Sequence, residues 1–93
     1  MASVYILFSA KLNKHYIGSC NDLVARMEEH KQKKYQGAYT KNSDDWELYL
    51  SINDLEYKQA RSIESHIKRM KSKVYIENLL NYPTIIERLR EQY

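Results

Sequence analysis

The chain has 93 residues, of which 43% are apolar, and it carries a formal net charge of +3 at pH 7. This length suits a single domain over residues 1–93 and leaves no room for a second core. No apolar run approaches the ~18 residues that a membrane span needs, and no signal-peptide pattern is present, so we expect a cytoplasmic protein without membrane contact. Cys20 is the only cysteine, which excludes an internal disulfide and a cysteine-based zinc site.

The N-terminal segment has the pattern of a β-hairpin. Residues 4–8 are β-branched, aromatic or otherwise apolar on both faces, which predicts a central strand. A polar turn around Asn13 and a second apolar run at Tyr16 and Ile17 predict an antiparallel partner strand. Gly18 ends this run, where the lack of a side chain permits an unusual backbone angle or the close approach of a ligand such as nucleic acid.

The next segment, residues 21–31, begins with two acceptable helix caps and continues as an amphipathic helix. Its predicted apolar stripe consists of Leu23, Val24 and Met27. Arg26 and His30 are four residues apart, so they lie on one side of the helix and flank this stripe. We therefore expect them at the rim of the core, near the strand that carries Tyr16. Taken singly, each also fits a solvated arginine or an ordinary helix-end histidine.

A loop and a third strand are expected next. Residues 32–44 show no clear period, which favours a loop. Residues 46–52 alternate, which predicts a strand with one apolar face. That face consists of Trp46, Leu48, Leu50 and Ile52.

The C-terminal part of the sequence is predicted to be helical. A longer helix follows Asn53 and Asp54, and its buried stripe consists of Ala60, Ile63, Ile67 and Met70. Glu64 borders this stripe, where a carboxylate is costly to bury unless it binds a cation or pairs with a neighbouring lysine or with Arg61. A last helix follows Pro83. The order β-β-α-β-α-α predicts an α+β domain with a small three-stranded antiparallel sheet flanked by helices.

Basic residues gather in two parts of the sequence. The first group is interleaved with tyrosines and consists of Lys31, Lys33, Lys34, Tyr35, Tyr39 and Lys41. The second group consists of Lys68, Arg69, Lys71 and Lys73. Lysines can contact phosphates while tyrosines stack on bases, so the first group is a candidate nucleic-acid contact. A solvated lysine-rich surface explains the same pattern equally well.

Five of these residues stand in an order that resembles a known family. Val4-Tyr5-Ile6 is followed by Tyr16-Ile17-Gly18 and then by Arg26, His30 and Glu64. This order resembles the GIY-YIG nuclease superfamily, and most of all its short single-domain bacterial members, which are related to the catalytic module of the excision-repair incision subunit. The similarity runs from Val4 to about Lys73 and is strongest over residues 16–30. The first motif departs from Gly-Ile-Tyr but keeps the tyrosine.

The resemblance implies a Mg²⁺-dependent endonuclease acting on DNA, with Mn²⁺ as a substitute ion and DNA repair as its setting. Tyr16 would then activate or orient the attacking water, and Tyr5 would support that water and a phosphate oxygen. Arg26 would clamp the scissile phosphate, His30 would assist the proton relay, and Glu64 would be the sole protein carboxylate on the metal. These residue types suit phosphodiester cleavage, which needs positive charge on the phosphate oxygens.

Other interpretations stay open at this stage. A catalytically weak or silent nucleic-acid-binding module would have the same fold, and a protein-interaction domain would fit the modest net charge. The sequence does not decide between DNA and RNA or between branched and unbranched substrates, and a partner protein is one possible source of specificity. Positions that vary in the resembling family, matched by Thr40 and by either Asn78 or Asn81, have no assigned role.

Overall fold

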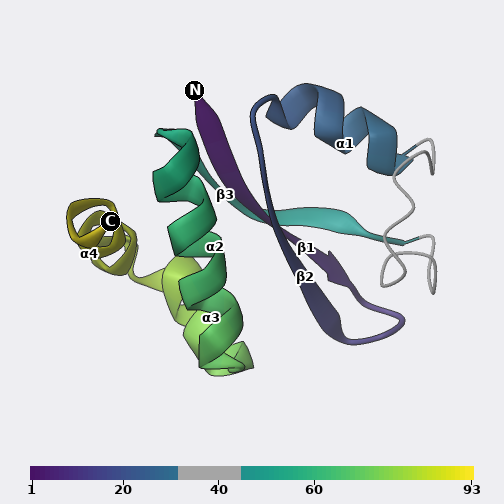
Figure 1. Ribbon diagram of the computed structural model, residues 1–93. Helices are drawn as coiled ribbons and strands as arrows, with labels where there is room; N and C mark the ends of the chain where they lie inside the picture. Colours follow the sequence, from purple (N-terminus) through teal and green to yellow (C-terminus); the bar gives the residue numbers. More distant parts are fainter. Residues whose placement is uncertain (32–44) are drawn as a thin grey trace.

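A three-stranded antiparallel sheet separates one helix from the other three (Figure 1). The structure is a computed structural model that describes residues 1–31 and 45–93, so the loop expected over 32–44 lies outside the described residues. The elements, in chain order, are β1 (Ala2–Ser9), β2 (Lys14–Cys20), α1 (Leu23–Lys31), β3 (Glu47–Leu55), α2 (Tyr57–Met70), α3 (Lys73–Asn81) and α4 (Pro83–Gln92). Within this described part of the chain, no helix is long and apolar enough to cross a membrane.

The central position predicted for the first strand is confirmed, because the strand order is β2-β1-β3. Val4 and Ile6 of β1 pack on the side of α2–α4, whereas Tyr5 and Leu7 pack on the side of α1. The turn predicted around Asn13 joins β1 to β2, and Asn13 adopts a φ of 52°, a left-handed conformation that asparagine tolerates well. The sheet thus buries β1 on both faces and leaves β2 as an edge strand.

The single apolar face predicted for the third strand is wrong. Leu50 pairs with Ile6 and Leu48 pairs with Leu7, so β3 carries one extra residue between them, a β-bulge that switches the face of the following side chains. Ile52 and Leu50 therefore pack toward α2, while Trp46 packs toward α1 and Leu48 is 48% exposed. The strand also continues to Leu55, beyond its predicted end.

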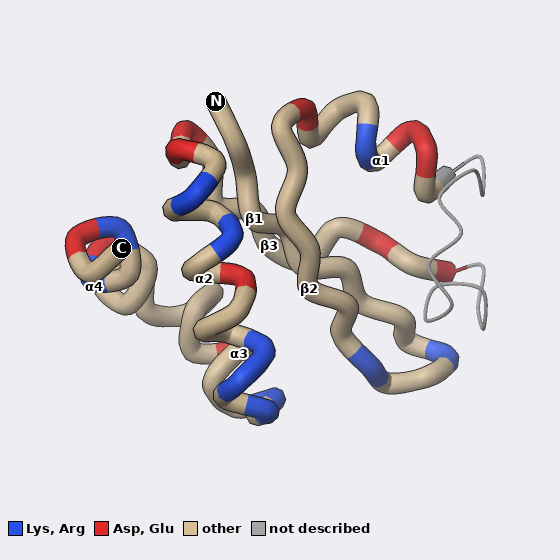
Figure 2. The backbone as a smooth tube through the Cα atoms, in the orientation of Figure 1, with Lys and Arg blue, Asp and Glu red and all other residues tan. Residues whose placement is uncertain are grey.

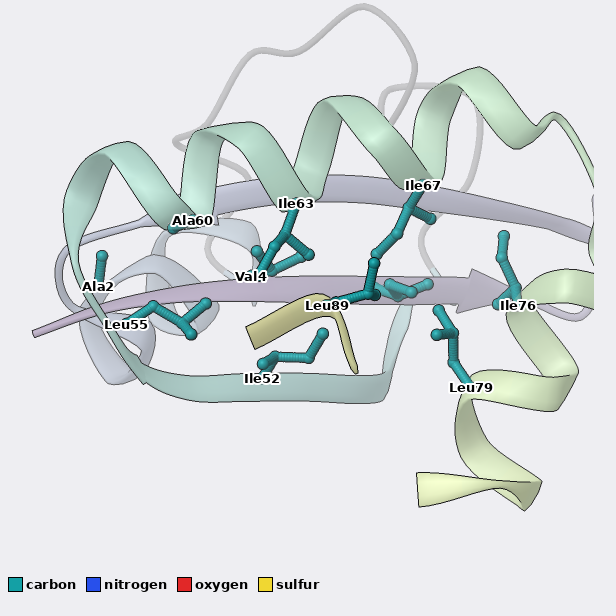
Figure 3. Close-up of a cluster of buried hydrophobic side chains, with 11 residues drawn as sticks. Ala2, Val4, Ile52, Leu55, Ala60, Ile63, Ile67, Ile76, Leu79 and Leu89 are labelled. Carbon is teal, nitrogen blue, oxygen red and sulfur yellow. The ribbon is translucent and has the colours of Figure 1, made fainter. Parts of the chain in front are cut away.

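The main core lies between the sheet and α2–α4, and Figure 3 shows side chains from both layers pointing toward one another. It consists of Ala2, Val4, Ile6, Ile52, Leu55, Ala60, Ile63, Ile67, Ile76, Leu79 and Leu89. The stripe predicted on α2 is confirmed at Ala60, Ile63 and Ile67, and each large member stabilises the fold by roughly 1.5–3 kcal/mol through burial. Met70 was predicted in the stripe but is 44% exposed, because α2 ends at this residue.

The helix α3 is an addition to the predicted order, which had one helix after α2 where the structure has two. Ser72 caps α3, since its Oγ accepts a hydrogen bond from the Tyr75 backbone N–H at 3.1 Å. Pro83 occupies the first turn of α4, as predicted. Ile76 of α3 and Leu89 of α4 are buried, so both helices close the main core.

Candidate active site

Gly18 makes room for the phenol of Tyr5. The two residues are opposite each other in the β1–β2 pair, and Tyr5 is fully buried. A Cβ atom built on Gly18 would lie 2.5 Å from Tyr5 Oη and 2.6 Å from Tyr5 Cζ, closer than real Cβ contacts allow. The glycine of this motif therefore serves the close approach of the Tyr5 ring, which crosses the edge strand at this point.

The Tyr5 hydroxyl joins Arg26 and His30 in one hydrogen-bonded chain. Arg26 Nη1 donates to Tyr5 Oη at 3.3 Å, and Tyr5 Oη lies 3.3 Å from His30 Nε2. A guanidinium only donates, so Tyr5 Oη accepts from Arg26, and the donor between Tyr5 and His30 is set by the His30 tautomer. Arg26 and His30 of α1, both predicted site residues, thus bond to the buried Tyr5 of β1.

Tyr16 completes a group of aromatic rings on the same face of the sheet. Its ring centroid lies 6.2 Å from that of Tyr5 and 5.9 Å from that of His30, the latter pair in an edge-to-face arrangement. Tyr5 and His30 are also edge to face at 5.8 Å. Unlike Tyr5, Tyr16 is only partly buried. The predicted residues Tyr5, Tyr16, Arg26 and His30 thus lie together.

The surroundings of His30 favour its neutral form. Burial lowers the pKa of the His30 imidazole, the charge of Arg26 lowers this pKa further, and Glu29 acts in the opposite direction. Glu29 also forms an ion pair with Arg26, 3.6 Å from Oε2 to Nε. His30 is therefore able to accept a hydrogen bond or a proton at neutral pH, while Arg26 keeps its charge beside it.

The helix that carries Arg26 and His30 is held at its N-terminus by Asp22. Asp22 Oδ1 accepts a hydrogen bond from the Ala25 backbone N–H at 3.1 Å, which confirms one of the two predicted caps. Leu23 and Met27 pack against the buried residues Tyr5, Leu7 and Cys20. Val24, predicted in the stripe, is 81% exposed, so α1 rests on a narrower apolar face than expected.

Glu64 lies on the other face of the sheet, where its described contacts are with Ser19 of β2 and Lys68 of α2. Its Oε1 accepts a hydrogen bond from Ser19 Oγ at 2.5 Å, and its Oε2 lies 2.6 Å from Lys68 Nζ. Ser19 follows Gly18, so its side chain points to the opposite face from Tyr5. The Glu64 side chain is 16% exposed. Gly18 and Ser19 are adjacent in β2, so this strand approaches Tyr5 on one face of the sheet and bonds to Glu64 on the other.

A comparison with known protein families shows which family has this combination of residues and fold. The model of the GIY-YIG catalytic domain matches residues 1–79. The chain belongs to the GIY-YIG family. Comparisons with curated proteins and with solved structures found no match.

The GIY-YIG catalytic domain implies nuclease activity and a nucleic-acid substrate, and such nucleases are typically dependent on a divalent metal. The match covers the sheet, α1, α2 and most of α3, and it ends before α4. Every site residue described above lies inside it. The fold expected from the resemblance, an α+β domain with a three-stranded antiparallel sheet, is present.

The oxygen ligands around Glu64 fit a hydrated magnesium ion better than a fully protein-coordinated metal. Among the described residues, no group of three or more His, Cys, Asp or Glu side chains could hold a metal. Magnesium takes one or two carboxylates and keeps several waters, so one carboxylate with a serine hydroxyl beside it is a suitable set. The Lys68 ammonium occupies the second carboxylate oxygen, so metal binding there requires this side chain to move.

Of the tyrosine-rich basic group, only Lys31 lies in the part of the chain that the structure describes. Lys31 is the last residue of α1. The remaining residues of that group lie outside the described residues, as does Thr40. They are Lys33, Lys34, Tyr35, Tyr39 and Lys41.

Two neighbours of Glu64 were not predicted as site residues. Lys68 stands four residues after Glu64, a spacing that favours an ion pair on a helix and was visible in the sequence. This ion pair is the salt bridge to a neighbouring lysine that the sequence analysis gave as one alternative for Glu64. Ser19 carried no such signal, because its contact joins residues 45 positions apart.

Proposed function

We propose that this chain is a metal-dependent endonuclease that hydrolyses phosphodiester bonds in DNA. The observation that carries the proposal is the hydrogen-bonded chain from Arg26 through Tyr5 to His30, formed over a glycine that leaves space for it. Burying a phenol, a cation and an imidazole together costs folding free energy that an apolar core would not lose. The same groups are suited to stabilising negative charge and transferring protons.

Arg26 is the residue proposed to bind the scissile phosphate. Its side chain is 26% exposed, so the guanidinium borders solvent while Tyr5 and Glu29 orient it. A planar guanidinium matches the geometry of two phosphate oxygens and offsets the negative charge that grows on them during attack. Tyr5 acts as a positioning residue in this proposal, because it is fully buried and fixes both Arg26 and His30.

Tyr16 is proposed to orient and deprotonate the attacking water. It is the more exposed of the two tyrosines and stands against the ring of His30. The water oxygen forms a bond to phosphorus, the bond from phosphorus to the leaving oxygen breaks, and Tyr16 Oη takes the water proton as it gives its own phenol proton to the neutral His30. The leaving oxygen takes its proton from solvent.

Glu64 is proposed to hold the divalent ion, with Ser19 fixing the carboxylate by its hydrogen bond. An ion held there supplies positive charge to phosphate oxygens and lowers the pKa of bound water. Mg²⁺ is the proposed physiological ion because the available ligands are hard oxygens and few in number. Mn²⁺ shares this preference and is the proposed substitute.

A second candidate function is favoured by the ion pair between Lys68 and Glu64. With the ammonium 2.6 Å from the carboxylate, the chain satisfies Glu64 without a metal and would serve as a nucleic-acid-binding module without catalysis. Nicking of DNA that depends on added metal separates the two functions, because only the endonuclease requires the ion.

The test uses the purified full chain with duplex, flap, junction and single-stranded DNA and with single-stranded RNA, each with Mg²⁺, with Mn²⁺ and with chelator. We expect metal-dependent cleavage of DNA, and Arg26→Gln should lower its rate by about 10²–10³-fold because a charged donor to the phosphate is lost. Arg88→Gln on α4 is the matched control, since Arg88 is exposed and outside the site. Equal rates for both variants would refute the assignment of Arg26, and cleavage confined to RNA would refute the choice of DNA.

A further inference from the structure

An open pocket of about 260 Å³ lies between β2 and the junction of α2 with α3. Ile17, Ile67 and Ile76 form its apolar walls. Its polar lining consists of Lys14, His15, Lys68, Lys71, Ser72 and Lys73. None of the described residues that line it is acidic. The pocket therefore combines an apolar floor with a positively charged rim.

The basic residues come from two separate parts of the chain. Figure 2 shows that the basic segments at the α2–α3 junction and at the β1–β2 turn lie at the same end of the molecule. Ser72 and Lys73 also form the start of α3, a nine-residue helix whose N-terminus adds a partial positive charge. Lysines from the α2–α3 junction, Lys14 at the start of β2 and the N-terminus of α3 thus lie around one pocket.

His15 adds an unusual feature to this pocket. Both of its ring nitrogens are buried, and neither has a hydrogen-bond partner among the described residues. Its ring packs against Phe8 and Tyr49, each at 4.9 Å between centroids, so the imidazole is held in place by aromatic contacts. Burial lowers the pKa of His15, the charge of Lys73 lowers it further, and Glu77 opposes this shift. A buried imidazole without a hydrogen-bond partner is costly to the fold.

Lys71 occupies a backbone conformation that glycine usually takes. It follows the last residue of α2 with φ 47° and ψ 42°, the left-handed conformation of a helix C-cap. A lysine there costs stability relative to glycine, because its Cβ crowds the backbone. The chain thus carries a charged side chain at this position on the rim of the pocket.

The pocket also adjoins the proposed catalytic site. Lys68 lines the pocket and pairs with Glu64, and β2 runs from Ser19 beside Glu64 to His15 inside the pocket. Four residues of extended strand span about 13 Å, a length that covers only a few nucleotides of a bound strand. A strand cleaved at the site can therefore place a neighbouring phosphate in the pocket.

We infer that this pocket binds a backbone phosphate of the nucleic-acid substrate, a few nucleotides from the cleaved bond. The inference rests on the proposed function and adds a second anchoring point to it. Lys71 and Lys73 contact the phosphate oxygens at the rim of the pocket, while Lys68 stands between this phosphate and Glu64. Two anchoring points on one strand fix its direction across the edge strand, which a single contact at Arg26 does not.

The test compares the double variant Lys71→Gly/Lys73→Ala with a control of equal charge, Lys58→Ala/Arg88→Ala. Lys58 and Arg88 are exposed and do not line the pocket. Binding of a fluorescent DNA duplex is measured by anisotropy in chelator over a series of salt concentrations. We expect the pocket variant to bind more weakly and its salt slope to fall by about one unit, as for the loss of one phosphate contact, with the control slope unchanged. Its melting temperature should not fall, because glycine suits the conformation of residue 71.

Three outcomes would overturn the inference. A wild-type slope in the pocket variant excludes the contact, and an equal fall in the control shows that only net charge matters. If inorganic phosphate raises the melting temperature of the wild type alone, and duplex binding is equal in both variants, the pocket binds free phosphate and not the substrate.

Nicking assays with Mg²⁺ distinguish this inference from the proposed nuclease function. A fall in salt slope without any nicking by the wild type supports the pocket and refutes the nuclease function. Nicking by the wild type with unchanged salt slopes supports the nuclease function and refutes the pocket.

Discussion

Replacing Gly18 by alanine should disturb both stability and activity through one steric contact. The new Cβ would lie 2.5 Å from Tyr5 Oη and 2.6 Å from Cζ, so the phenol must move by about 1 Å to restore ordinary contact. Tyr5 is fully buried in the sheet, and overpacking of this kind costs about 1–3 kcal/mol of folding free energy. For a domain of this size that cost corresponds to a fall in melting temperature of about 5–20 °C.

The same displacement should break the hydrogen-bonded chain, because Tyr5 Oη is 3.3 Å from both Arg26 Nη1 and His30 Nε2 in the native structure. A double-mutant cycle with Tyr5→Leu isolates the steric term, since leucine does not reach over residue 18. Thermal unfolding and DNA nicking are measured on the single variants and on the double variant. In the Tyr5→Leu background, Gly18→Ala should cost little stability. A Gly18→Ala protein with wild-type melting temperature and nicking would refute the reasoning.

Three further predictions concern Ser19, Tyr16 and the two partly buried histidines. Ser19→Ala should lower the affinity for Mn²⁺, measured by calorimetry, by about 10-fold, because Glu64 loses the hydrogen bond that orients it. Ser19→Thr keeps the hydroxyl and should keep the affinity. Equal affinities in all three forms would contradict the role of Ser19 in orienting Glu64. Tyr16→Phe should abolish nicking and keep Mn²⁺ affinity, whereas parallel losses of both would place Tyr16 on the metal. The free energy of unfolding, followed by urea titration, should fall as the pH drops below about 6.5, because the lowered pKa values of His15 and His30 mean that the unfolded chain binds protons first. Replacing both histidines by glutamine should flatten this dependence, and a profile as steep as that of the wild type would contradict the assignment.

The elements with a strong local pattern were predictable from the sequence. The run of apolar residues on both faces of β1 indicated a central strand, and Ile63 and Ile67 marked the buried side of α2. The second strand and the helix with Arg26 followed from turn and capping residues, although the strand continues to Cys20 and not only to its predicted end at Gly18. Local spacing decides such features, because each is formed by residues near one another in the chain.

The features that local spacing missed depend on tertiary contacts. The bulge in β3 adds a residue that no alternation rule marks, and it moves Trp46 to the face opposite Ile52. Val24 is exposed because it lies outside the face of α1 whose Leu23 and Met27 pack on the sheet. The role of Gly18 became clear only with the Tyr5 ring across from it, and the contact between Ser19 and Glu64 joins distant segments.

Part of the site also depended on the resemblance rather than on periodicity. Helical spacing placed Arg26 and His30 on one side of α1, but it did not indicate the phenol that bonds to both. Spacing alone also gave two accounts of Glu64, a metal ligand and a partner of a neighbouring lysine. The structure contains the lysine contact, and the metal role stays a prediction.

Nicking of DNA by Glu64→Gln in the presence of Mg²⁺ tests the central claim most directly. Glutamine keeps the shape and the acceptor for Ser19 but removes the charge that binds a hard cation. The lost ion pair with a half-exposed Lys68 is worth at most about 1 kcal/mol, so the variant should stay folded. Glu87→Gln on the exposed side of α4 is the control. We predict that Glu64→Gln binds DNA, melts near the wild-type temperature and does not nick, while Glu87→Gln nicks normally. Wild-type nicking by a folded Glu64→Gln protein would contradict the proposed metal site and the mechanism built on it.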